Sequence, residues 1–78
     1  MKVATWNVNS IRLRLDQVLA WTAATGTDVV CLQETKVVDE DFPVSEIADA
    51  GYHAAFFGEK SYNGVAIISK HEISDVQK

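Results

Sequence analysis

A carboxylate at the end of a short apolar run is the first feature of this sequence that could carry chemistry. Residues 29–32 are all apolar, and Gln33, Glu34, Thr35 and Lys36 follow them directly. The run is too short for an ordinary helix and rich in β-branched residues, which favours a strand buried on both faces. Ligands of an open α/β sheet bind just outside the carboxyl ends of its strands. Glu34 is therefore well placed to hold a cation, or else it only caps the following loop, since one carboxylate alone is weak evidence.

A strand–helix–strand unit is expected to position this carboxylate. Residues 2–8 predict a first strand that ends in a polar, turn-forming cluster. A helix is expected from about residue 12, and Gly26 stands where a helix C-cap residue is expected. The apolar stripe of this helix consists of Ile11, Leu15, Val18, Leu19 and Thr22.

Short loops make this unit a parallel crossover, which is right-handed in nearly all known cases. The carboxyl ends of its two strands then lie at the same edge of the sheet. Asn7 and Glu34 are therefore expected to emerge side by side, although they are far apart in the sequence. Two separate polar residues thus become one candidate site.

The second half of the chain continues the alternation of strands and helices. The acidic residues 39–41 are most simply a solvated stretch that favours the N-terminus of the next helix, since no spaced oxygen-ligand pattern accompanies them. A short helix is predicted over residues 44–50, with Pro43 in its first turn and Gly51 at its end. Two further strands are predicted: residues 52–57 and the near-continuous apolar run 65–69.

Composition limits the class of protein. A chain of 78 residues holds at most one domain, and 47% hydrophobic residues favour globular packing. Averaged over the chain, a net charge of −4 is not the basic charge that is typical of nucleic-acid-binding proteins. It does not exclude a metal-dependent nuclease, because such an enzyme carries acidic ligands beside its basic contacts. The single cysteine, Cys31, is expected to be buried and reduced, which together with the N-terminal sequence predicts a cytoplasmic protein. The apolar runs are too short to span a membrane.

The predicted burial of the strands implies a larger architecture. The strands at residues 29–33 and 65–69 are predicted to be buried on both faces, as in a sheet covered on both sides. Two helices cannot cover both faces of a four-stranded sheet. Either more chain or another subunit is expected to supply the second layer.

Three segments together resemble the first signature segments of the exonuclease III family. They are Thr-Trp-Asn-Val-Asn-Ser-Ile-Arg at residues 5–12, Leu-Gln-Glu-Thr-Lys at 32–36, and Lys-Ser-Tyr-Asn-Gly-Val-Ala-Ile at 60–67. This family comprises DNA-repair nucleases of the endonuclease/exonuclease/phosphatase superfamily. The resemblance implies an α/β fold, the N-terminal portion of a four-layer α/β sandwich in the order β-α-β-α-β-β. Residues 1–78 would be an incomplete domain, with further catalytic residues of the family beyond Lys78.

The resemblance also implies roles for residues at the predicted strand ends. Glu34 matches a glutamate that binds Mg²⁺ or Mn²⁺, and such hard cations prefer oxygen ligands. Asn7 matches an asparagine that orients groups around the metal and the scissile phosphate. Lys36 is similar to a lysine just behind the metal ligand, and Asn9 is assigned to the same surroundings. The alternatives are that Asn7 simply ends a strand and that Lys36 is solvated.

Further residues resemble the family's DNA contacts. Ser10, Arg12 and Lys60 look like contacts to the phosphate backbone, and Tyr62 looks like a residue facing the minor groove. Arg12 could instead be solvated, Tyr62 could only cover its turn, and Asn63 with Gly64 could be hairpin chemistry. Neither histidine matches a catalytic position.

The implied function is that of a Mg²⁺-dependent phosphodiesterase acting on double-stranded DNA, at abasic sites or at 3′ ends. The complete enzyme is expected to be a monomer, and the 78-residue chain alone is expected to be inactive. One alternative is a superfamily member acting on RNA or on phospholipid head groups. Another is a noncatalytic α/β module that self-associates through an open sheet face.

Overall fold

The structure is a computed structural model and describes residues 1–58 and 64–73 of the chain. The described residues form β1 (Val3–Asn7), α1 (Ile11–Thr25), β2 (Val29–Gln33), the 3-10 helix η1 (Asp39–Asp41), α2 (Val44–Asp49), β3 (His53–Phe57) and β4 (Val65–Ser69). The predicted order is confirmed, and η1 is an addition inside a loop that was expected to be irregular. Several predicted ends are wrong by one residue. The first strand, for example, was expected over residues 2–8 and spans Val3–Asn7, the range over which β1 pairs with β2.

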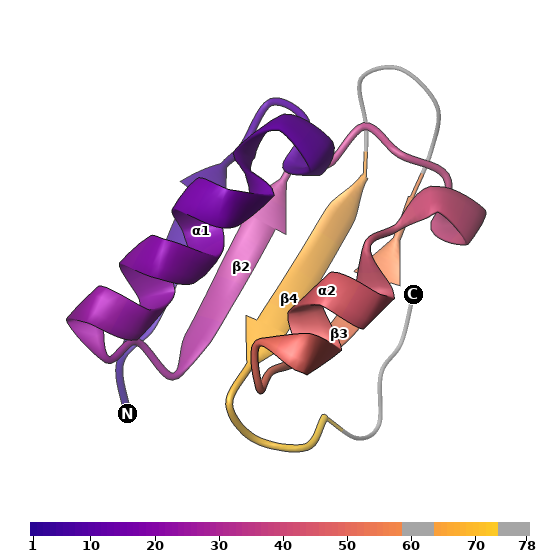
Figure 1. Cartoon of the computed structure of the whole chain (residues 1–78). Helices are drawn as coiled ribbons and strands as arrows, with labels where there is room; N and C mark the ends of the chain where they lie inside the picture. Colours follow the sequence, from indigo (N-terminus) through magenta and orange to yellow (C-terminus); the bar gives the residue numbers. More distant parts are fainter. Residues whose placement is uncertain (59–63, 74–78) are drawn as a thin grey trace.

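The four strands form one mixed sheet in the order β1-β2-β4-β3 (Figure 1). β1 and β2 are parallel, whereas β4 is antiparallel to both of its neighbours, β2 and β3. The parallel crossover from β1 through α1 to β2 is the one predicted. It brings the carboxyl ends of β1 and β2 to the same edge, which is the edge where β4 begins.

The end of helix α1 is set by local backbone chemistry. The helix starts directly after Ser10, and Gly26 follows its last residue with φ of 67°. A left-handed residue at this position lets the backbone N–H return to the last turn, and glycine adopts that conformation without a side-chain penalty. The buried stripe of α1 comprises Ile11, Leu15, Val18 and Thr22, as predicted, whereas Leu19 is only partly buried.

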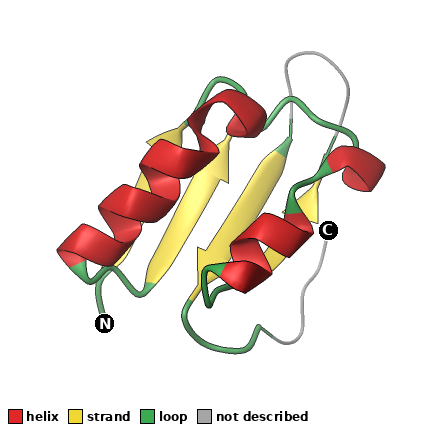
Figure 2. Ribbon diagram, viewed as in Figure 1, coloured by secondary structure: helices red, strands yellow, loops and turns green. Residues whose placement is uncertain are grey.

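Both helices cover the same face of the sheet (Figure 2). α1 lies over β1 and β2, and α2 lies over β4 and β3. Between the helices and the sheet lies a core that includes Val30 and Leu32 from β2 and Ala66 and Ile68 from β4. Two aromatic pairs extend this core: the Trp6 and Trp21 rings meet edge-on with centroids 5.6 Å apart, and Phe42 stacks on Phe56 with centroids 4.1 Å apart.

The opposite face of the sheet is open, as expected for a chain whose two helices can cover only one face, so the described residues do not supply the second layer that burial of β2 and β4 on both faces would need. Val3, Val65, Phe57 and Ile67 point to the open face and are 58%, 53%, 44% and 39% exposed. The neighbouring residues of β2 on this face are partly buried. Burying one large apolar side chain stabilises a fold by about 1.5–3 kcal/mol, and none of the described elements supplies the layer that would do so.

Two smaller expectations are also corrected. Cys31 is a free thiol, as predicted, but it is only partly buried because it lies on the open face, in register with Ile67. Asp39 is not merely solvated, because its carboxylate accepts a 2.7 Å hydrogen bond from the Gly58 backbone N–H. Among the described helices, none is long and apolar enough to cross a membrane.

Candidate functional site

The loop after β1 is joined to the end of β2 by backbone hydrogen bonds. These bonds continue the parallel ladder beyond the last paired strand residues, so the loop that leads into α1 follows the segment after β2. The donors and acceptors are Val8 N to Gln33 O at 3.0 Å, Ser10 N to Glu34 O at 2.9 Å and Ile11 N to Thr35 O at 3.0 Å. Two loops that are distant in the sequence are thereby held as one rigid edge.

Four polar side chains close into a ring at this edge, which we call the strand-end ring (Asn7, Asn9, Glu34, Lys36). The Asn7 amide donates to Glu34 Oε2, and the Lys36 ammonium donates to Asn9 Oδ1. The Asn9 backbone N–H donates to Asn7 Oδ1 at 3.2 Å, and Lys36 Nζ lies 3.9 Å from Glu34 Oε1. The structure therefore brings Asn7 and Glu34 side by side, as the crossover argument predicted. Their roles toward a metal remain predictions.

The strand-end ring is open to solvent. The Glu34 side chain is 43% exposed and the Lys36 side chain 25%. An exposed ion pair of this kind contributes only about 0–1 kcal/mol to stability. The small contribution of this ion pair to stability does not explain why four polar groups lie together here. Binding of an external ligand explains the arrangement better.

The backbone of the same edge adopts an uncommon conformation. Four non-glycine residues with positive φ occur in the described chain, and all belong to this edge: Asn9 at 48°, Ser10 at 96°, Glu34 at 54° and Lys36 at 58°. Asparagine tolerates this region, but for other side chains it costs on the order of 1–3 kcal/mol per residue. The cost at Glu34 and Lys36 exceeds what their exposed ion pair returns. Strain of this kind collects at functional sites.

The side-chain oxygen atoms of the strand-end ring are suitable ligands for a hard divalent cation. Glu34 offers a carboxylate and Asn7 an amide oxygen, and Mg²⁺ is commonly held by one or two carboxylates together with several waters. The described part of the chain contains no group of three or more histidine, cysteine, aspartate or glutamate residues that could hold a metal. The fit is therefore to a cation that keeps open positions for water or substrate, and not to a closed structural metal site.

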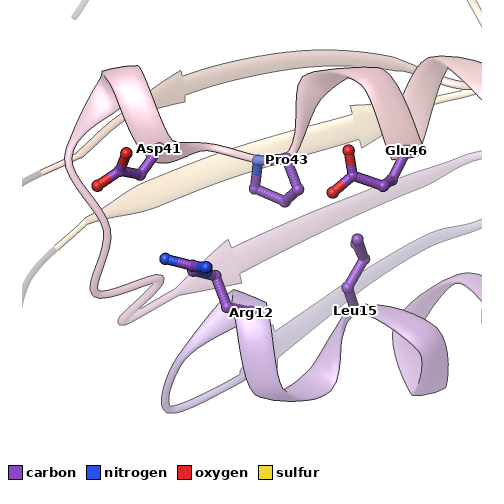
Figure 3. Close-up of a pocket in the computed structure, with 5 residues that line it drawn as sticks. All are labelled: Arg12, Leu15, Asp41, Pro43 and Glu46. Atoms are coloured by element: carbon purple, nitrogen blue, oxygen red, sulfur yellow. The ribbon is translucent and has the colours of Figure 1, made fainter.

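The structure places only some of the residues that were predicted to contact DNA. Ser10 precedes α1, and its side chain makes no capping hydrogen bond to the helix. Arg12 points across a pocket of about 330 Å³ toward the acidic side of η1 and α2 (Figure 3). That pocket is lined by Arg12, Leu15, Asp41, Pro43 and Glu46. The carboxylates of Asp41 and Glu46 belong to the same pocket, so the surroundings of Arg12 are partly acidic. Lys60 and Tyr62 lie outside the described residues.

Sequence reasoning assigned no role to two residues that hold this edge together, Thr35 and Gly64. The Thr35 backbone N–H donates to Gly64 O at 3.2 Å. Thr35 is completely buried, although it stands between two partly exposed charged residues. The Asn-Gly pair before β4 was the only local signal, and it predicts a turn and not a contact with β2.

Neither histidine lies at the strand-end ring. His53 lies at the exposed start of β3, and His71 lies 3.9 Å from Asp28 at the opposite end of β2.

Comparison with known proteins agrees with this architecture. Residues 4–78 match the model of the endonuclease/exonuclease/phosphatase family. Over 72 residues the chain is 40% identical to exodeoxyribonuclease III of Haemophilus influenzae, a match that covers 92% of this chain and 27% of that protein. It is 32% identical over 77 residues to the DNA repair nuclease APEX1 of Danio rerio, covering 92% of this chain and 25% of that protein.

Solved structures are similar as well. An AP endonuclease from Archaeoglobus fulgidus superposes with a TM-score of 0.94 and 48% identity, covering 99% of this chain and 30% of that one. A 3′ phosphatase from Neisseria, bound to product DNA hairpin, superposes with a TM-score of 0.92 and 43% identity, covering 96% of this chain and 29% of that one. The chain thus spans less than a third of the length of these relatives.

Proposed function

Because this chain belongs to the endonuclease/exonuclease/phosphatase family, we propose that it is the N-terminal part of a metal-dependent DNA-repair phosphodiesterase. The proposed reactions are cleavage of double-stranded DNA at abasic sites and trimming of 3′ ends. The observation that carries the proposal is the strand-end ring, in which a solvent-accessible carboxylate is held by an amide at a strained strand end. The named activities of the relatives support the choice of DNA.

Glu34 would hold the cation, and we propose Mg²⁺ or Mn²⁺. Its carboxylate is oriented by the Asn7 amide, which donates to Oε2. A cation bound there supplies Lewis-acid stabilisation of the charge that develops on the phosphate and its leaving oxygen. The Lys36 ammonium, held by Asn9, balances the negative charge of Glu34. Ser10 and Arg12 are proposed to contact the phosphate backbone beside this site.

The catalytic base and the acid for the leaving group are proposed to come from the rest of a longer protein. The strand-end ring contains one carboxylate and no histidine. The open sheet face is proposed to pack against that same additional chain, since it leaves four large apolar side chains exposed. We further propose that the complete enzyme is a cytoplasmic monomer.

The isolated 78-residue chain is predicted to be catalytically inactive, whereas a longer protein that contains it is predicted to cleave abasic DNA. The measurement is incubation of each with Mg²⁺ and a duplex that carries one abasic site, followed by gel analysis of the products. Omission of the metal is the control, and it is expected to abolish cleavage. Cleavage by the isolated chain that vanishes with Glu34→Ala would overturn the prediction of inactivity. A longer protein inert on DNA but active on RNA or a phospholipid head group would overturn the proposed substrate.

The open sheet face also supports the rival hypothesis of a noncatalytic module that self-associates. Exposed apolar patches of this kind drive association. Sedimentation of the isolated chain separates the two hypotheses. A compact, cooperatively folded dimer at micromolar concentration favours the module, whereas a poorly folded or heterogeneously aggregated chain favours a missing part of one domain.

A further inference from the structure

Thr35 is a buried residue between two partly exposed charged ones, and its placement is unusual. Thr35 is 0% exposed, and its hydroxyl oxygen has no hydrogen-bond partner among the residues that the structure describes. Buried polar atoms are nearly always hydrogen-bonded, so an exception of this kind requires an explanation. Glu34 and Lys36, on either side, both have positive φ. The unpartnered hydroxyl therefore sits at the centre of the strained segment that carries the strand-end ring.

The close approach of Thr35 to Gly64 accounts for this arrangement. A Cβ placed on Gly64 would lie 2.2 Å from Thr35 Oγ1 and 3.4 Å from the Lys36 backbone nitrogen. Gly64 also has φ of 115°, which side-chain-bearing residues rarely adopt. The Thr35 side chain thus fills the space that a side chain at Gly64 would need. Its Oγ1 atom makes contact by shape and not by hydrogen bonding.

The backbone of Thr35 connects three elements. Its N–H donates to Gly64 O, directly before β4, and its carbonyl accepts from Ile11 N at the first residue of α1. The segment after β2 is therefore fixed on two sides at Thr35, while its neighbours on either side turn through left-handed conformations. A small displacement of Thr35 would be transmitted directly to both neighbouring backbones.

From these contacts we infer that Thr35 is a positioning residue, whose side chain packed against Gly64 sets the Glu34 carboxylate and the Lys36 ammonium in the strand-end ring. The inference rests on the proposed function for what the ring does, but the geometry of the ring can be tested independently. Side-chain volume is the property that matters, because the hydroxyl has no partner among the described residues. Valine matches threonine in shape and lacks the hydroxyl, whereas alanine removes the atoms that face Gly64.

The experiment compares Thr35→Val and Thr35→Ala in the complete protein. Crystal structures of both variants are the first measurement. In Thr35→Val, Glu34 and Lys36 are expected to keep positive φ and the Asn7 to Glu34 hydrogen bond. In Thr35→Ala, at least one of these features is expected to be lost. An unchanged ring in Thr35→Ala would overturn the inference.

The second measurement is a Mg²⁺ titration of abasic-site cleavage. Thr35→Ala is expected to lower kcat by about 10- to 100-fold, as for other residues that orient a metal ligand, and to raise the Mg²⁺ midpoint with little change in KM for DNA. Thr35→Val is expected to stay within about threefold of wild type, since shape is kept, and to melt no lower, because an unpartnered buried hydroxyl is removed. If Thr35→Val loses as much activity as Thr35→Ala, the hydroxyl acts chemically and the inference is wrong.

Thr22→Ala is the matched control. Thr22 is also a buried threonine, but it lies on α1 and its hydroxyl donates to Val18 O at 2.7 Å. Its removal is expected to lower the melting temperature and to leave the Mg²⁺ midpoint unchanged. If Thr35→Ala does not fold, Thr35→Ser takes its place in both measurements, because it loses only the methyl group and keeps the hydroxyl; a ring and Mg²⁺ midpoint unchanged in Thr35→Ser would then overturn the inference. If the wild-type protein cleaves no DNA, the proposed function fails, while the crystal structures still decide whether Thr35 positions the ring.

Discussion

The two ends of β2 solve the same backbone problem in opposite ways. Before β2 the chain must leave α1 through a left-handed residue, and glycine occupies that position at Gly26 with φ of 67°. After β2 the chain again turns through left-handed conformations, but here Glu34 and Lys36 adopt them. Glycine would relieve the cost, on the order of 1–2 kcal/mol for an ordinary side chain. The difference indicates that side-chain chemistry is required at one end and is dispensable at the other.

The polar groups at the two ends of β2 also differ in whether backbone strain accompanies them. At the amino end of β2, the Asp28 carboxylate accepts a 2.7 Å hydrogen bond from the Lys2 backbone N–H and lies 3.9 Å from both Lys70 Nζ and His71 Nε2. These contacts tie the start of β1 and the end of β4 to β2 without backbone strain. At the carboxyl end, strain and an unpartnered hydroxyl accompany the polar groups. This contrast agrees with the proposal that the carboxyl end binds a ligand, whereas the contacts of the amino end only join strands.

The largest expected effect is that of Glu34→Gln in the complete protein. Abasic-site cleavage is expected to fall by orders of magnitude at ordinary Mg²⁺, because several kcal/mol of charge stabilisation depend on the bound cation. The melting temperature is expected to change little, since the shape of the side chain is kept. Raising Mg²⁺ is expected to recover part of the activity. A Mg²⁺ titration of cleavage together with thermal melting measures both quantities.

Asp28→Asn is the matched control for that variant, because it makes the same chemical change at the other end of β2. It is expected to lower the melting temperature and to leave cleavage unaltered. Wild-type cleavage by Glu34→Gln with an unshifted Mg²⁺ midpoint would show that Glu34 is not the metal ligand, and the contrast between the two ends would then fail.

A smaller effect is expected from Lys36→Ala. Lys36 donates to Asn9 and lies 3.9 Å from Glu34, so it acts on the carboxylate from beside it. Loss of a group that surrounds a metal ligand typically costs about 10- to 100-fold in metal affinity or activity. The measurement is kcat for abasic-site cleavage at saturating DNA. Lys70→Ala removes a lysine at the same distance from Asp28 and is the control, with no expected effect on kcat. Equal rates for the two lysine variants would erase the distinction between the ends.

The smallest effect concerns pH and the amino end alone. The hydrogen bond from the Lys2 backbone N–H, assisted by Lys70, the chain's amino terminus and His71, holds the pKa of Asp28 below its ordinary value of 3.8. A carboxylate with a lowered pKa stabilises the folded state above its ordinary pKa, and this contribution disappears as the pH falls through the folded value. The melting temperatures of wild type and Asp28→Asn are therefore expected to differ most above the ordinary pKa of 3.8 and to converge as the pH falls below it. A difference in melting temperature that grows as the pH falls would contradict the assigned contacts of Asp28.

Most of the local structure and one essential juxtaposition of residues could be predicted from the amino-acid sequence alone. The periodic stripe of α1, the left-handed cap at Gly26 and the short apolar run of β2 are properties of neighbouring residues, so they could be predicted. The short loops of the crossover then placed Asn7 beside Glu34, because parallel strands joined in this way end at one edge of a sheet. The segments at residues 5–12, 32–36 and 60–67 identified the family that the comparisons confirm.

The surroundings of Asn7 and Glu34, in contrast, depend on tertiary packing and could not be predicted. The contact of Thr35 with Gly64 joins segments that no periodicity relates, and the positive φ of Glu34 and Lys36 follows from those joins and not from their own propensities. Arg12 shares a pocket with Asp41 of η1 and Glu46 of α2 because of how the helices lie on the sheet. Burial of β2 and β4 was predicted on both faces from their apolar residues, yet hydrophobicity says only that a face can be covered. Whether a layer of chain covers it depends on the rest of the fold.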